Sequence, residues 1–205
     1  MPLTRTRMPS TSLQLPRRPD LDLDLFGAGD VADLDRSVDL ESLVFAQPSA
    51  GEVDLTDARL AQVSITQAQV ASLIAARAEW HDVEISGRFG SIDGDGARLR
   101  CVRFVDCKLG YVNLRGAELL DVTFSNCLIE ELDLLQSSLR RVQLDSTEVG
   151  TLTVRQAKLR DVDLRGGRFE SIEGLMELGG ATISAEQAVE FAPAFATELG
   201  IRIQG

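Results

Sequence analysis

The side chains that could carry out chemistry are few and widely separated. The chain has three cysteines, Cys101, Cys107 and Cys127, and a single histidine, His81. A structural zinc site takes four cysteine or histidine ligands, and nucleophilic catalysis needs a base within reach of the nucleophile. His81 belongs to no Ser-His-Asp or Cys-His arrangement that the sequence reveals. We therefore expect no catalytic residue, no metal ligand and no cofactor site.

The glycine pairs of the chain lack the context of a phosphate-binding loop. Residues 27–29 and 94–96 each hold two glycines, but neither pair lies between a strand and a helix, as such a loop requires. The many carboxylates follow a repeat that places polar side chains outside. The sequence thus favours a protein that is not an enzyme.

A five-residue period organises most of the chain. The stretch from Phe89 to Gly174 repeats every five residues, and from Leu99 to Phe169 an apolar residue recurs at every fifth position, which neither the helical period nor the strand period explains. A second apolar residue, smaller on average, lies two positions before each of them. The large positions include Leu99, Phe104, Leu109, Leu114, Leu119, Phe124, Ile129, Leu134 and Leu139.

Residues 20 positions apart are similar in size, so a longer period lies above the first. The second apolar position is small in every fourth unit, at Gly87, Cys107, Cys127, Thr147 and Gly167. This predicts coils of four five-residue sides, in which equivalent residues stack at the strand spacing of about 4.8 Å. One coil cannot bury its own inner residues, so neighbouring coils must form the core together. On this basis Cys107 and Cys127 are core residues.

The pattern extends back to residue 38 with one irregularity. Only Ser86 separates Ile85 from Gly87, where two residues are normal, and the order of the columns continues across this gap. We interpret it as one tightened corner within a continuous solenoid. The repeat then covers residues 38–174, which corresponds to about seven coils.

The repeat resembles that of the pentapeptide-repeat family, whose units follow a loose A-(D/N)-L-x-x pattern. Ala58-Arg59-Leu60, Val112-Asn113-Leu114, Leu132-Asp133-Leu134 and Val162-Asp163-Leu164 carry the resemblance. It implies an all-β fold, a right-handed quadrilateral parallel β-helix. The family includes quinolone-resistance proteins, acidic dimers that imitate DNA and occupy the DNA site of gyrase.

The N-terminal residues differ in composition from the repeat. Residues 1–19 hold four prolines and four arginines without an acidic residue, which is typical of a disordered basic tail. Residues 20–37 are expected to form an N-terminal cap, because solenoid ends need covering. Within them, residues 20–26 alternate Asp and Leu and end in Phe26, a pattern that predicts an edge strand.

Residues 175–205 are expected to form a C-terminal helical cap. Ser184 and Gln187 have the spacing of a capping box, and Gly200 suits a helix end. Pro193 predicts a kink or two short helices, and residues 201–203 are expected to form a strand. The resemblance implies that such a cap can also pair subunits. The possible cap or dimer contacts are Val189, Phe191, Phe195 and Leu199.

The charge of the chain, net −11, is unevenly distributed. Residues 35–86 carry 3 basic and 9 acidic groups, whereas residues 87–174 carry 13 and 14. A possible acidic partner surface in the first coils consists of Asp39, Glu41, Asp54 and Asp57. One side of the later coils is locally basic and could bind an acidic partner. This possible basic face consists of Arg98, Arg100, Arg140, Arg141, Lys158 and Arg160.

These features lead to two functional hypotheses. The first is a non-enzymatic scaffold that binds an unidentified protein partner through its outer faces, with a possible homodimer through the cap. The alternative, which the resemblance implies, is an acidic DNA mimic that binds DNA gyrase and modulates quinolone susceptibility. The chain has no apolar run near 18 residues and no apolar core of a signal peptide, so we expect a cytoplasmic protein without membrane contact. Its negative charge predicts no direct binding of nucleic acid.

Overall fold

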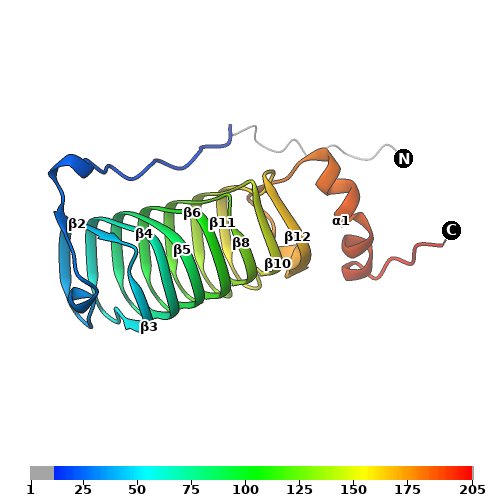
Figure 1. Ribbon diagram of the computed structural model, residues 1–205. Coiled ribbons are helices and arrows are strands. Elements are labelled where there is room, and N and C mark those ends of the chain that lie inside the picture. The colour runs from blue at the N-terminus through cyan, green and yellow to red at the C-terminus, as the bar shows by residue number, and fades with distance from the viewer. Residues whose placement is uncertain (1–11, 205) are drawn as a thin grey trace.

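Parallel strands wind into a rod-shaped β-solenoid, with a helix at one end (Figure 1). The structure is a computed structural model that describes residues 12–204. The strands are β1 Gly27–Ala28, β2 Asp39–Ala46, β3 Ser49–Asp54, β4 Arg59–Ile74, β5 Glu79–Asp93, β6 Arg98–Asn113, β7 Glu118–Ser125, β8 Leu128–Asp133, β9 Ser138–Asp145, β10 Thr147–Thr153, β11 Lys158–Asp163, β12 Gly167–Glu173 and β13 Ala181–Thr182. The helical elements are the 3₁₀ turns η1 Leu23–Leu25, η2 Val31–Asp33 and η3 Leu175–Glu177, and the helix α1 Ala185–Glu198. The predicted all-β solenoid is confirmed.

The strand register places residues 20 apart beside each other. Leu99 pairs with Leu119, and Leu119 pairs with Leu139. Both apolar positions of the repeat point inward, so the core is one continuous cluster from the first coil to the last. Phe104 and Phe124 stack with ring centroids 4.7 Å apart, because the coil spacing brings two equal rings into contact.

The small column holds thiols and hydroxyls in the core. Cys107 and Cys127 are buried and unoxidised. The Cys107 thiol donates to the carbonyl oxygen of Ile85 at 3.4 Å. The Thr147 hydroxyl donates to the carbonyl oxygen of Phe124 at 3.1 Å. The hydrogen bond with Cys127 and burial raise the pKa of the Cys107 thiol. These side chains satisfy inward-pointing backbone groups, as core residues must.

The corners of the coils need left-handed backbone. Among the residues that the structure describes, seventeen other than glycine have φ between 50° and 60°, and they recur at the same corners of successive coils. Asp, Asn, Ser and Gln hold most of these positions; polar side chains that bond locally tolerate this conformation best. The repeat therefore keeps polar residues at corners for backbone reasons as well as for solubility.

The tightened corner at Ser86 is confirmed. Ile85 pairs with Phe104, whereas Gly87 pairs with Cys107, so one residue is missing at this corner. The Ser86 hydroxyl accepts the N–H of Gln67 at 3.0 Å and takes the place of a missing backbone acceptor. Gly87 has φ of 128°, and a Cβ there would overlap the backbone of Ala68.

The N-terminal cap differs from the predicted edge strand. Residues 23–25 form η1, and the strand that covers the first coil is β1, paired with β2 through Gly27 and Leu43. The N–H of Gly29 bonds to the carbonyl of Val44 at 2.9 Å, and Gly29 lies against the ring of Phe45, where no side chain would fit. Together β1 and β13 extend the stack to about eight turns, compared with the seven coils predicted.

The C-terminal cap is one continuous helix, α1, although Pro193 lies within it. Pro193 has no N–H to donate to the carbonyl oxygen of Val189. Because Val189 is 76% exposed, a water molecule can donate to this oxygen instead. The capping box is confirmed by bonds of 3.1 Å and 2.8 Å between Ser184 and Gln187. The strand predicted for residues 201–203 is wrong: they are irregular and exposed, and the N–H of Ile201 bonds to the carbonyl of Ala196 at the end of α1.

We predict that Gly87→Ala destabilises the solenoid strongly. The backbone conformation alone should cost about 1–3 kcal/mol, and overlap with Ala68 adds to it. Gly51→Ala is the control, because nothing lies within 4 Å of its added Cβ. Thermal unfolding followed by the fluorescence of Trp80 measures both, and equal melting temperatures would contradict the tight-corner interpretation.

Candidate protein-interaction faces

One side of the rod carries a ladder of alternating charges. We call it the charged face; one of its columns holds the residues that come directly before the inward-pointing residues from Leu40 to Leu159. Glu79 bridges its two neighbours in this column, Arg59 at 3.5 Å and Arg98 at 2.6 Å. The column reads Asp39, Arg59, Glu79, Arg98, Glu118, Ser138 and Lys158. Adjacent charges along the rod therefore compensate each other.

The structure divides the six residues of the predicted basic face. Arg98 is paired with Glu79, and Arg141 is largely buried in a two-bond pair with Asp121 at 2.6 and 2.7 Å. Arg160 lies 3.8 Å from Asp161. Lys158 lies beside Ser138 in the alternating column, and Lys158, Arg100 and Arg140 have no ion-pair partner within residues 12–204.

Three of these arginines share one outward column of the charged face. Arg100 and Arg140 both pair in register with Leu120, and Arg140 pairs with Arg160. All three are exposed. We call Arg100, Arg140 and Arg160 the arginine column; it is the part of the predicted basic face that remains open to a partner.

The four carboxylates of the predicted acidic surface do not form one patch. Asp39 and Glu41 lie on the charged face, whereas Asp54 pairs with Ile74 on another side of the coil. Asp57 holds Arg77 through bonds of 2.7 and 2.8 Å, and this hydrogen bond lowers the pKa of Asp57. Hydrogen bonds from Thr56 lower the pKa of Asp54, which also lies 3.4 Å from Arg36.

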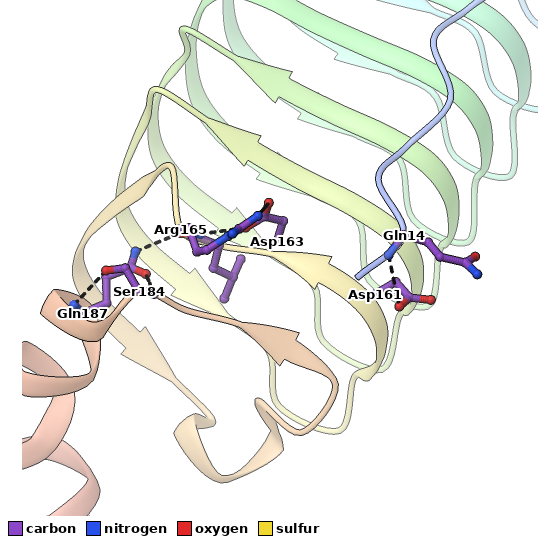
Figure 2. Close-up of polar contacts among 7 residues, drawn as sticks. Gln14, Asp161, Asp163, Arg165, Ser184 and Gln187 are labelled. Carbon is purple, nitrogen blue, oxygen red and sulfur yellow. Dashed lines mark hydrogen bonds and ion pairs between the residues drawn. The ribbon is translucent and has the colours of Figure 1, made fainter. Parts of the chain in front are cut away.

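Carboxylates with a structural role recur just before corners. Asp133 accepts the N–H of Leu135 at 2.9 Å, and Asp163 accepts that of Arg165 at 3.1 Å, so each side chain closes a local turn. Arg165 adds bonds of 2.9 and 2.8 Å to Asp163 (Figure 2), and these bonds lower the pKa of Asp163. The Asp or Asn of the repeat unit thus stabilises backbone and is not a free charge.

The segment from Ser12 to Asp20 lies along the outside of the rod. It runs from the first coil back toward the end that carries α1 (Figure 1). A disordered tail was expected for residues 1–19; residues 12–19 instead lie against the solenoid, and residues 1–11 are outside the described residues. Its backbone N–H groups bond to the carboxylates of Asp82, Asp121 and Asp161. We call residues 12–20 the strap.

Sequence reasoning missed the three strap-binding aspartates. Asp82, Asp121 and Asp161 occupy the same corner of every second coil, a spacing that is visible in the sequence. Nothing in the solenoid pattern, however, distinguishes them from other polar corner residues. The sequence signal that indicates a docked segment is the three-residue spacing of Leu13, Pro16 and Pro19 in the strap.

The four predicted cap contacts have different roles. Phe191 is buried and meets Phe169 edge-to-face, with ring centroids 6.2 Å apart, and Phe195 packs behind it at 6.5 Å. Gln187 donates to the carbonyl oxygens of Leu164 and Gly167, both at 2.8 Å, and so closes the open end of the last coil. Val189 points away from the coil stack and is 76% exposed.

Leu199 lines an apolar groove beside the cap. The groove encloses about 360 Å³ between α1 and η3, and its walls include Met176, Leu178, Ile183 and Phe195. Leu199 and Met176 are 58% and 56% exposed. The cap thus covers the coil stack with one set of apolar residues and leaves a second set at the surface.

No arrangement in residues 12–204 suggests catalysis. Within that range no three His, Cys, Asp or Glu side chains are grouped to hold a metal ion. A groove of about 920 Å³ lies between the last coils and α1 and is lined by both Arg168 and Glu148, without cysteine or histidine. None of the described helices has the length and apolarity to cross a membrane.

Comparisons with known proteins show little similarity in sequence. No family model and no curated protein matches the chain. Among solved structures, QnrB1, a plasmid-mediated fluoroquinolone resistance protein, aligns with 88% of this chain and 99% of its own at 16% identity and a TM-score of 0.31. HetL, a pentapeptide repeat protein involved in heterocyst differentiation regulation from the cyanobacterium Nostoc sp., aligns with 72% and 90% at 15% identity and a TM-score of 0.21. Likenesses at these scores carry no functional argument.

The repeat architecture is established by the residues and strand pairing of the chain itself. The five-residue units, the 20-residue coil and the parallel stacking are all present in the structure. The chain folds as a parallel β-solenoid of five-residue units.

Proposed function

We propose that the protein is a non-enzymatic scaffold that binds a protein partner through the outer faces of its solenoid. The observation that supports this is the arginine column. Where most charges of the rod are compensated by a neighbour, Arg100 and Arg140 are exposed without an ion-pair partner within the described residues. Such a strip suits an acidic protein surface.

The rod is suited to binding because it is rigid. Its backbone is hydrogen-bonded from coil to coil, and side chains of one column are spaced at about 4.8 Å. Preorganised contacts lose little conformational entropy on association. The net charge of −11 disfavours nucleic acid as the partner, despite the local basic strip. The proposal retains the cytoplasmic location expected from the sequence.

We predict that reversing the arginine column removes a partner. The variant combines Arg100→Glu, Arg140→Glu and Arg160→Glu, and the control carries Arg88→Glu, Lys108→Glu and Arg168→Glu on another side of the rod. Both change the charge equally. A partner captured from the native host should bind the parent and the control, and lose at least about tenfold in affinity for the variant. Equal losses in both variants would indicate a general charge effect and contradict this assignment.

The alternative function, a gyrase-binding DNA mimic, has weaker support. DNA carries one negative charge for about every 1.7 Å of its axis, so a mimic as long as the seven repeat coils would present on the order of 20 charges. Residues 35–174 carry 16 basic and 23 acidic groups, a net −7. Two of the four carboxylates of the acidic surface, Asp54 and Asp57, are also compensated by Arg36 and Arg77.

We predict weak or no inhibition of gyrase supercoiling and no protection from quinolones. The physical reason is the low and compensated charge of the rod. A supercoiling assay with purified gyrase, with and without a quinolone, measures both effects. Potent inhibition that disappears on neutralising Asp39, Glu41, Asp54 and Asp57 would support the mimic and refute the scaffold hypothesis in its present form.

We also propose that the protein forms a homodimer through the cap groove. Leu199 and Met176 line this groove, and Ile201 and Ile203, 57% and 67% exposed, follow directly on α1. Exposed apolar side chains gathered at one end of a soluble rod favour association. Phe191 and Phe195 cover the end of the coil stack, so we expect them to stabilise the fold more than the contact between subunits.

We predict that Leu199→Glu converts the dimer to a monomer. The added charge would lie in the apolar groove, where burial against a second subunit is costly. Val189→Glu is the control: it adds the same charge within α1, at another of the four predicted contacts, which does not line the groove. Light scattering after gel filtration measures the mass. A parent that is monomeric at high concentration contradicts dimerisation outright.

A further inference from the structure

The strap has a three-residue period. Within residues 12–20 only Leu13, Pro16 and Pro19 are half-buried against the rod, and the residues between them are exposed. The residue after each of these donates its backbone N–H to a carboxylate: Gln14 to Asp161 at 3.5 Å, Arg17 to Asp121 at 3.0 Å and Asp20 to Asp82 at 3.0 Å. Three residues per turn is the period of polyproline II.

The prolines favour this conformation before the strap meets the rod. Each fixes its own φ near −65° and restricts the residue before it, so Leu15 and Arg18 are biased as well. The entropy lost on docking is correspondingly small. The strap is therefore a preorganised ligand, attached to the rest of the chain through residues 21–26.

The rod matches the strap in dimension. Three residues of polyproline II advance about 9.3 Å, and two coils of the solenoid advance about 9.6 Å. The acceptors Asp82, Asp121 and Asp161 lie two coils apart at one corner, with Cys101 and Arg141 in the coils between them. Every third backbone N–H of the strap therefore bonds to an aspartate, and these aspartates lie in every second coil. Figure 2 shows the last of these contacts, between Gln14 and Asp161.

The central acceptor is held in place as a charged group. Burial acts to raise the pKa of Asp121, but the hydrogen bonds from Arg141 and from the N–H of Arg17 outweigh it and hold that pKa below its ordinary value. The Asp121 side chain is only 3% exposed. An ionised carboxylate under the strap is a strong acceptor for a backbone N–H.

We propose that the corner column of Asp82, Asp121 and Asp161 is a binding site for polyproline II segments, which residues 13–20 occupy as an intramolecular ligand. The partner that fits is a proline-rich segment of another protein, with an apolar residue or proline at every third position. The site contacts backbone N–H groups and every third side chain, so it accepts any sequence with that spacing. Such a segment binds by displacing the strap. This goes beyond the proposed function, because it concerns a different column of the rod and does not depend on the arginine column.

The proposal is tested first in the full chain with two matched variants. The proline variant carries Gln14→Pro, Arg17→Pro and Asp20→Pro, which keep polyproline II but remove all three donors. The alanine variant carries Gln14→Ala, Arg17→Ala and Asp20→Ala, which keep the donors. Only the proline variant should release the strap, since the three substitutions place a ring where each N–H met its carboxylate.

Cys101 reports the release directly. It lies between Asp82 and Asp121 under the path of the strap and is partly buried, and burial raises the pKa of its thiol. Cys107 and Cys127 are buried in the core. Labelling of Cys101 by a thiol reagent should be at least about tenfold faster in the proline variant, as the loss of three hydrogen bonds predicts, and unchanged in the alanine variant. Equal rates in the two variants would overturn the proposal.

The second measurement tests the site itself. A fluorescent peptide of residues 12–21 should bind the proline variant and bind the parent at least about tenfold more weakly, because the strap competes in the parent. The same peptide N-methylated at its third, sixth and ninth residues, which correspond to Gln14, Arg17 and Asp20, should not bind. Failure of the unmodified peptide to bind the proline variant, equal binding of the N-methylated peptide, or equal binding by the parent would each refute the proposal.

Discussion

The backbone hydrogen bonds between coils determine the rest of the structure. Each coil pairs in register with the coil before it, so residues 20 apart lie next to each other in the same column, one coil spacing apart along the rod. This register makes every column uniform in environment: inner columns are buried and mostly apolar, and corner columns keep left-handed residues. A one-residue error at any corner would turn the following inner residues outward. The tightened corner at Ser86 is tolerated because Gly87 restores the register.

The same register explains why the surface charges produce only a weak net field around the rod. Side chains in one column are about 4.8 Å apart, close enough for opposite charges to pair along the rod. Glu79 lies between Arg59 and Arg98, and Asp57 holds Arg77. The net charge of the chain therefore overstates the field that a partner would meet. What distinguishes one face from another is the position of charges that the ladder leaves without a partner, such as Arg100 and Arg140.

The coils could be predicted from the sequence because each residue's environment recurs 20 positions later. Leu119, Cys107 and even the short corner at Ser86 followed from this repetition. The strap could not, because its contacts join residues as far as 147 positions apart and use backbone N–H groups, which leave no side-chain pattern. The burial of Arg141 escaped prediction for a related reason, since its partner Asp121 lies at a corner and not on a flat side. Residues 201–203 alternate apolar and polar residues as a strand does, but they are irregular and exposed, and the N–H of Ile201 bonds to the end of α1.

The strap shows how a solenoid can bind a chain that is not a strand. A β-strand added along the axis would find no edge there, because the coils already pair with one another through their backbones. A polyproline II segment needs no such edge, since its N–H groups make no internal hydrogen bonds and every third one points to the same side. The match between three residues of that helix and two coils depends only on the two spacings, which are general to both structures. The aspartates at alternate coils are what this chain adds, and their placement turns a common match of dimensions into a specific contact.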